Sequence, residues 1–186
     1  GTYAGLSSPP TDSVCLMGIN QRAAIVMSDA EIATFIAQQR TATLATTGPD
    51  GAIHLVAMWY GVLNGEVWFE TKAKSQKAVN LRRNPRCSLM IEDGQTYDRL
   101  RGIAIEGTAE IHDDEDHTLA TGISVWERYH GPFTAEMRPL VDQMMHNRVA
   151  IHISANRIRS WDHRKLGLPA MPLAGSTVPF LNAPND

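Results

Sequence analysis

Alternating apolar and polar positions run through the middle of the chain and predict strands. Over Leu100–Ile111, apolar residues such as Ile105 alternate with polar ones such as Glu106. A strand presents successive side chains to opposite faces, so this segment is expected to bury one face and leave the other open. Shorter runs predict further strands over Thr41–Thr47, Ala52–Tyr60, Glu66–Thr71, Arg86–Glu92 and Val149–Ile153.

Capping and turn signals lie between these runs. Ser28 and Glu31 have the spacing of a capping box, which predicts a helix that begins at Ser28 and ends near Gln39. The pair Asn64-Gly65 tolerates positive φ angles and predicts a tight hairpin.

Three more helices are predicted further along the chain. The first covers Ser75–Asn84 and is stopped by Pro85, which cannot continue a helix. Another covers 113–130, with acidic residues in its first turn and an apolar stripe made of Leu119, Ile123 and Trp126. The last covers 137–145.

Short strands joined by hairpins and short helices favour a mainly β (α+β) fold, an antiparallel barrel with helices packed outside it. The folded body is expected over residues 27–167. Residues 1–26 form an expected irregular arm without the features of a signal peptide. Residues 168–186 form a Pro-rich tail, in which the spacing of the prolines disfavours regular structure.

Composition narrows the class of protein. The 186 residues carry 17 Lys and Arg against 20 Asp and Glu, which disfavours a generally basic nucleic-acid binder. No apolar run approaches the roughly 20 residues of a membrane span. Cys15 and Cys87 are too few for a disulfide scaffold, so a reducing, cytoplasmic setting is the expectation.

The most informative segment is basic. No acidic residue lies between Glu70 and Glu92, and Lys72, Lys74 and Lys77 gather where the second predicted helix begins. Cations are unfavourable at a helix N-terminus unless an anion lies among them. With the hydroxyls of Thr71 and Ser75 and free N–H groups, they would form a phosphate site. A solvated charged face is the alternative, and nucleic acid is disfavoured because no aromatic residue interleaves the lysines.

Four parts of the chain carry a family resemblance through their order and spacing: Val67–Arg86, Ala42–Thr46 with Gly48–Gly51, Gly102–Glu110 and Ser160–Lys165. Together they resemble the pyridoxamine-phosphate-oxidase-like superfamily of flavin and deazaflavin oxidoreductases. The resemblance covers residues 28–168. The Thr-Lys-x-Lys-Ser-x-Lys spacing is most similar to the branch that binds the deazaflavin coenzyme F-420.

This resemblance implies a split antiparallel β-barrel, the FMN-binding split barrel, that forms a homodimer with two sites at the subunit interface. FMN is the alternative cofactor, although FMN oxidases usually carry an Arg-Lys pair where this chain has Gln76-Lys77, and an Arg near the position of His54. The implied cofactor contacts are His54, Val56 and Met58 for the ring, Thr71, Lys72, Lys74, Ser75, Gln76 and Lys77 for the phosphate, and Trp161 and Arg164 from the partner chain.

The implied reaction is hydride transfer from reduced F-420 to a conjugated, electrophilic small molecule, with the cofactor supplying the chemistry. Tyr60, His54 or solvent would supply the proton. An FMN oxidoreductase and a non-catalytic cofactor-binding protein of the same fold remain alternatives. No membrane or nucleic-acid partner is expected.

Several other histidine, cysteine and arginine side chains are expected to have structural and not functional roles. The segment His112–His117 contains possible metal ligands, but acidic residues in a first helical turn explain it more simply, and no metal site is predicted. Cys87 is expected in the core, and His152 is expected to point away from Val149 and Ile151. Arg82 and Arg83 are expected to form a solvated helix end.

Overall fold

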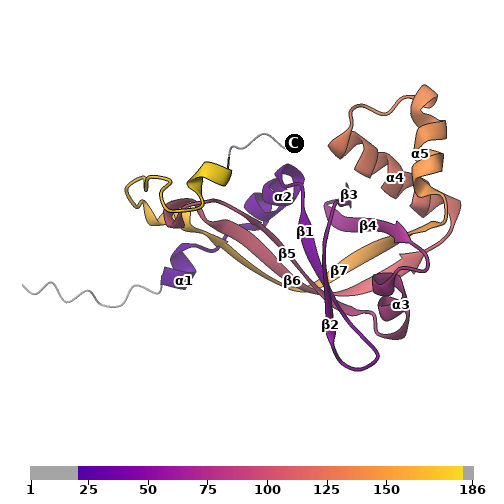
Figure 1. Cartoon of the computed structure of the whole chain (residues 1–186), viewed down its shortest axis with the longest axis horizontal. Coiled ribbons are helices and arrows are strands. Elements are labelled where there is room, and N and C mark those ends of the chain that lie inside the picture. The colour runs from indigo at the N-terminus through magenta and orange to yellow at the C-terminus, as the bar shows by residue number, and fades with distance from the viewer. Residues whose placement is uncertain (1–20, 182–186) are drawn as a thin grey trace, which may run out of the picture.

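A computed structural model describes residues 21–181 of the chain. Seven antiparallel strands form one curled sheet in the order β2-β1-β5-β6-β7-β4-β3, a half-barrel with helices around it (Figure 1). The split-barrel fold class predicted from the sequence is confirmed. The strands are β1 (Ala42–Thr47), β2 (Ile53–Met58), β3 (Gly61–Leu63), β4 (Glu66–Lys72), β5 (Arg86–Asp93), β6 (Arg101–His112) and β7 (Arg148–Asp162).

The hairpin at Asn64-Gly65 is confirmed, with φ angles of 53° and 81°. The strand predicted over Ala52–Tyr60, however, ends at Met58, and β3 begins at Gly61. The backbone of Tyr60 explains the break. Its N–H donates to the Tyr129 hydroxyl at 3.0 Å and its carbonyl accepts from Arg128 at 2.8 Å, so it binds a helix and not a neighbouring strand.

Strand β7 has 15 residues, three times the predicted length. The sequence does not predict its second half because apolar and polar residues do not alternate there. The first half, up to Ile153, buries apolar side chains. Beyond it lies an irregularity of pairing at Glu106/Gly107 of β6, and residues 155–158 are exposed on both faces. Backbone pairing with β6 holds this part of the strand without a buried face.

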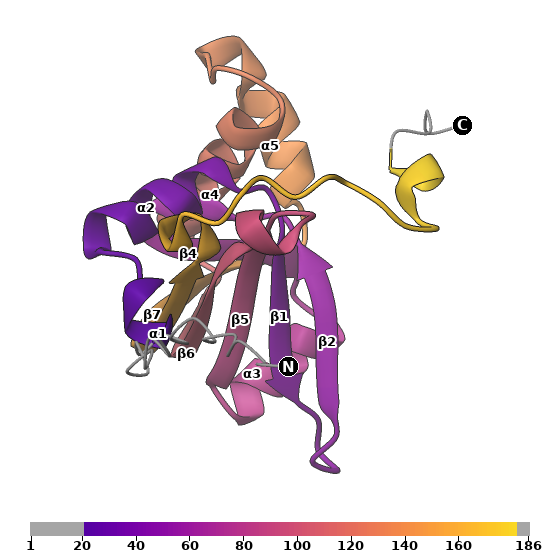
Figure 2. The ribbon, with the colours of Figure 1, turned by 90° about the vertical axis from the view of Figure 1, so that its left-hand side faces the viewer.

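Five helices accompany the sheet in the described part of the chain. Ser28 caps α2, where both capping-box hydrogen bonds form, and Ser75 caps α3, so both predicted helix starts are confirmed. Figure 2, turned by 90°, shows α4 and α5 together and α3 well apart from them. The helices are α1 (Gln21–Ala24), α2 (Asp29–Gln38), α3 (Gln76–Arg83), α4 (Glu115–Tyr129) and α5 (Arg138–Met145).

Most of the predicted irregular arm, residues 1–20, and residues 182–186 of the predicted tail lie outside the described residues. Residues 21–24 of the arm form α1, and Val178–Phe180 of the tail forms a short 3-10 turn. Among residues 21–181, no helix has both the length and the apolar character that a membrane span requires.

The buried face of α4 differs from the predicted stripe. Leu119, Ile123 and Trp126 are only partly buried, whereas small residues face the interior. Ser124 exchanges hydrogen bonds with the backbone of Val62 in β3, at 2.9 and 3.1 Å, which requires a close approach of helix and strand. Small side chains permit that approach, so apolar periodicity is misleading for this helix. The buried residues are Thr121, Gly122, Ser124 and Val125.

The core lies between the strands and the helices α2 and α3, which contribute Phe35, Ile36, Ala78 and Leu81 to it. Cys87 belongs to this core, as predicted, and burial raises the pKa of its thiol to about 11. The largest fully buried apolar side chains of the core are Phe35, Leu44, Tyr60, Phe69, Leu89, Ile91, Ile103 and Ile151.

Arg128 of α4 joins three parts of the fold. Its guanidinium donates to the carbonyl of Tyr60 at 2.8 Å, to that of Ala37 at 2.9 Å, and to that of Gln39. It also lies over the Tyr60 ring, 4.5 Å from the centroid. One side chain therefore satisfies carbonyl groups at the end of α2 and at the break between β2 and β3.

We expect Arg128→Met to lower the free energy of unfolding by about 3 kcal/mol, because three charge-assisted hydrogen bonds to backbone carbonyls are lost. Urea unfolding monitored by circular dichroism measures this change. Arg138→Met is the matched control. Within residues 21–181, Arg138 forms ion pairs with the surface acids Glu115 and Asp142 alone, so its loss should matter much less. Equal effects of the two substitutions would contradict the role given to Arg128.

Candidate functional site

The lysine cluster, defined as Lys72, Lys74 and Lys77, surrounds the first turn of α3. Ser75 caps the helix by accepting from the N–H of Ala78, and this turn contains no acidic residue. Lys72 and Lys74 are exposed. The first N–H groups of a helix have no partner within it, so positive charge and free donors converge at this point.

Lys77 is held more firmly than its neighbours. Its Nζ donates to the Thr71 hydroxyl at 3.1 Å, and that hydroxyl lies 3.1 Å from the Ser75 hydroxyl. Burial lowers the pKa of Lys77, Glu70 opposes this change and Arg148 adds to it. The three polar groups at the end of β4 and the start of α3 therefore form one connected set.

Asn80 anchors α3 to the sheet and was not singled out in the sequence. It is fully buried, accepts from Gln76 Nε2 at 2.8 Å and donates to Thr46 of β1 at 3.0 Å. This bond holds α3 against β1, the strand that pairs with β2. An amide between the buried Ala78 and Leu81 is the sequence signal that could have shown it.

His54, Val56 and Met58 lie on the inner face of β2, because the other face carries Ile53 and Leu55. His54 pairs across from Thr46, the partner of Asn80. Its buried Nδ1 has no hydrogen-bond partner among residues 21–181. Val56 and Met58 pack against the core. The proposed contact of these residues with a cofactor ring stays a prediction.

Trp161 and Arg164 lie far from the lysine cluster within one chain. Arg148 pairs with Lys72, whereas Trp161 pairs with Gly102 near the other end of β7. At roughly 3.3 Å per residue, about 40 Å of strand separates the two ends. Only a second copy of the chain could bring Trp161 or Arg164 to the cluster.

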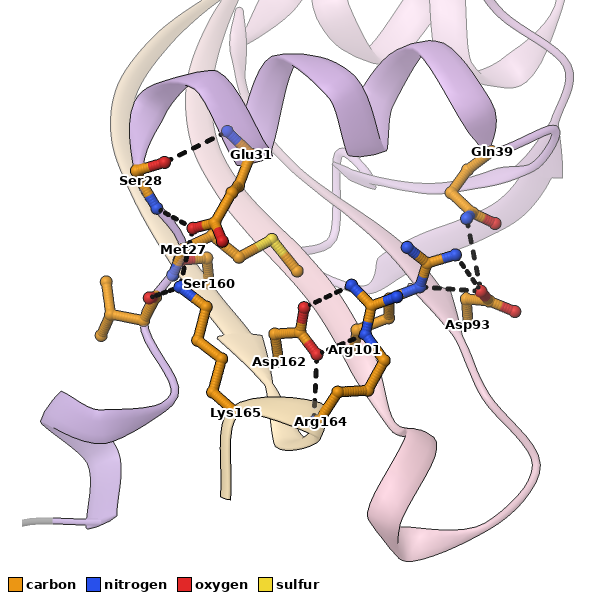
Figure 3. Close-up of polar contacts among 11 residues, drawn as sticks. Met27, Ser28, Glu31, Gln39, Asp93, Arg101, Ser160, Asp162, Arg164 and Lys165 are labelled. Carbon is orange, nitrogen blue, oxygen red and sulfur yellow. Dashed lines mark hydrogen bonds and ion pairs between the residues drawn. The ribbon is translucent and has the colours of Figure 1, made fainter. Parts of the chain in front are cut away.

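The segment that contains Trp161 and Arg164 forms polar contacts within its own chain (Figure 3). Arg164 binds Asp162 with contacts of 2.8 and 2.6 Å, and this hydrogen bonding holds the pKa of Asp162 below its usual range. Lys165 donates to Glu31 at 2.7 Å, and Ser160 accepts from the N–H of Met27 at 3.0 Å. The end of β7 and the turn that follows it are thus hydrogen-bonded to the start of α2.

The structure places Arg82, Arg83 and His152 as the sequence predicts. Arg82 and Arg83 are exposed at the end of α3, as predicted, and donate to the carbonyls of Ala73 and Thr47. His152 points away from the buried Val149 and Ile151, as predicted.

Tyr60 is wrong as a candidate proton donor to a substrate. Its side chain is fully buried, and the hydroxyl donates to the carbonyl of Ile36 at 2.7 Å. Burial raises its pKa to about 12. The group is closed to solvent and stabilises the end of α2, so His54 and solvent remain from the predicted set of donors.

We expect Tyr60→Phe to lower the free energy of unfolding by about 1 kcal/mol, the usual value for one neutral hydrogen bond. Binding of F-420 or FMN, followed by fluorescence, should be unchanged. A loss of cofactor binding without a loss of stability would show that the hydroxyl acts in the site after all.

Comparison with known proteins places this arrangement in a family. No curated protein sequence matches the chain. The conserved hypothetical protein Rv2991 of Mycobacterium tuberculosis is 63% identical, with a TM-score of 0.83 over 84% of this chain and 98% of that chain. A protein described as an F-420 reductase is 27% identical, with a TM-score of 0.50 over 67% of this chain and 93% of that chain.

The heme storage protein HutZ of Vibrio cholerae shares the fold at 16% identity, with a TM-score of 0.55 over 70% of this chain and 92% of that chain. The model of the pyridoxamine 5'-phosphate oxidase family matches residues 28–162, from the cap of α2 to the end of β7. With its half-barrel and with helix α3 after β4, the chain belongs to the pyridoxamine 5'-phosphate oxidase family.

Proposed function

We propose that this protein is an oxidoreductase that uses the deazaflavin coenzyme F-420 to reduce a conjugated, electrophilic small molecule. The observation that carries the proposal is the lysine cluster at the open N-terminus of α3, which has cations and free N–H groups but no acid. The 27% identity to a protein described as an F-420 reductase supports the same assignment.

The residues present fit an anionic cofactor. The phosphate would bind at Lys72, Lys74, Lys77 and the first turn of α3, with Thr71, Ser75 and Gln76 beside it. The unpartnered Nδ1 of His54 offers a polar contact to the cofactor ring. When bound, reduced F-420 supplies a hydride to an electrophilic carbon, and a proton completes the reduction. The chain binds and orients the cofactor, and His54 or solvent delivers the proton.

A homodimer completes the proposed site. Strand β2 exposes Ile53 (61%) and Leu55 (64%) on its outer face, and β5 exposes Met90 (42%). Pairing through β1 places these side chains on one side of the sheet, since Leu55 pairs with Ala45 and Met90 with Thr43. An apolar patch of this kind marks an interface. A partner seated there would also supply Trp161 and Arg164.

We expect Lys74→Ala and Lys77→Ala each to weaken F-420 binding by about 1.5–3 kcal/mol, the contribution of a hydrogen bond to a charged group. Fluorescence titration of the purified protein measures the dissociation constant. Arg22→Ala in α1 is the control, because it removes a cation outside the lysine cluster. Unchanged binding by both lysine variants would remove the phosphate site from this helix.

The same titration with FMN separates the two branches of the family. Tight F-420 binding with weak FMN binding supports the proposal and justifies a search for substrates with the reduced cofactor. The opposite preference assigns the chain to the FMN-binding alternative. Binding without turnover of any electrophile would favour a non-catalytic cofactor-binding protein.

We expect Leu55→Glu to convert the dimer to a monomer, because two charges would be buried in the apolar interface. Light scattering after size-exclusion chromatography measures the mass. Leu140→Glu is the matched control, because Leu140 is also exposed but lies on α5. A monomeric parent, or a dimeric Leu55→Glu variant, would contradict the proposed interface.

A further inference from the structure

Two histidines and an aspartate converge where β6 ends and α4 begins. His112 is the last residue of β6, Asp114 is the N-cap of α4, and His117 lies in the first turn of that helix. One ligand atom from each residue can be chosen so that all three lie within 4.8 Å of one another. This cluster lies apart from the lysine cluster: it packs on Trp68, four residues before Lys72 on β4, roughly 13 Å along the strand.

Both imidazoles direct Nδ1 toward the same carboxylate. His117 Nδ1 lies 2.8 Å from Asp114 Oδ1 and 2.9 Å from Oδ2, and His112 Nδ1 lies 3.9 Å from Oδ2. The two rings stack with centroids 4.1 Å apart. The backbone N–H of His117 also donates to Asp114 at 3.0 Å, so the carboxylate is held in place by the helix cap.

The surroundings support a cation at this point. The Nε2 atom of His112 is buried and has no hydrogen-bond partner in the described part of the chain, and a carboxylate oxygen of Glu110 lies 3.8 Å away. Glu110 is also 3.9 Å from His152, which binds Glu66 at 2.8 Å. A capping function explains Asp114 and packing on Trp68 explains the position of His112, but neither satisfies the buried Nε2 of His112.

We propose that His112, Asp114 and His117 bind one divalent ion of the zinc type. Zinc binds imidazole nitrogen and carboxylate oxygen at about 2.0–2.2 Å. His117 and Asp114 already offer ligand atoms 2.8 Å apart, and the His112 ring would turn out of its stack on His117 to direct Nδ1 at the same ion. Two nitrogen donors favour zinc, cobalt or nickel over magnesium and calcium, which prefer oxygen. Water completes the coordination.

The unpartnered nitrogen has a role in such a site. A histidine that binds a metal through one nitrogen commonly donates its other N–H to a carboxylate, which fixes the ring. With Nδ1 of His112 on the ion, Nε2 would carry the proton and face Glu110. The ion would join the end of β6 to the start of α4, two elements that the chain connects through Asp113 and Asp114.

The test is calorimetric titration of the full chain, freed of metal with a chelator, with zinc chloride alone. We expect one equivalent to bind. His117→Gln should weaken binding at least tenfold, and Asp114→Asn should do the same while keeping a residue that caps helices well. His146→Gln is the control, because His146 is an exposed histidine at the end of α5 and should leave binding unchanged.

A second measurement separates a lost ligand from a lost fold. Zinc should raise the melting temperature of the parent and of His146→Gln, and should not raise that of His117→Gln, which should still unfold cooperatively without metal. Cobalt in place of zinc should give visible absorption bands that His117→Gln lacks. Absence of binding by the parent, or equal binding by His117→Gln and the parent, overturns the proposal.

Discussion

The pairing of β6 with β7 is the constraint on which the rest of the structure depends. It runs from Arg101↔Asp162 to His112↔Ala150, the full length of β6. At one end β7 also pairs with β4 and so positions α3 and the lysine cluster. At the other end, Ser160 of β7 and Lys165 just after the strand form hydrogen bonds to the start of α2. One long strand thus sets the separation between the proposed phosphate site and the residues that a second subunit would contribute.

Local signals allowed much of the fold to be predicted. The Ser28 cap, the Asn64-Gly65 hairpin and helix α3 depend on neighbouring residues, so the sequence contains them directly. Tertiary contacts decided the rest. The second half of β7 is held by backbone pairing without an apolar pattern, and α4 buries small residues because it approaches β3 closely.

The same distinction holds for the candidate site. The residues of the proposed phosphate site are close in sequence, and the structure joins Thr71, Ser75 and Lys77 in one hydrogen-bonded set. Tyr60 was a poor candidate because its burial depends on α2 and α4, which its own segment does not reveal. Asn80 was overlooked for a related reason, since its partner Thr46 lies on a distant strand.

The hydrogen bonds of Arg128 have a consequence for how the molecule opens. They attach α4 to the end of α2 and to the residue that separates β2 from β3. When α4 detaches, those carbonyls lose their donor at the same moment, so the end of α2 should loosen with it. In native-state hydrogen exchange, amides of these distant segments would then share one opening free energy and behave as a single cooperative unit.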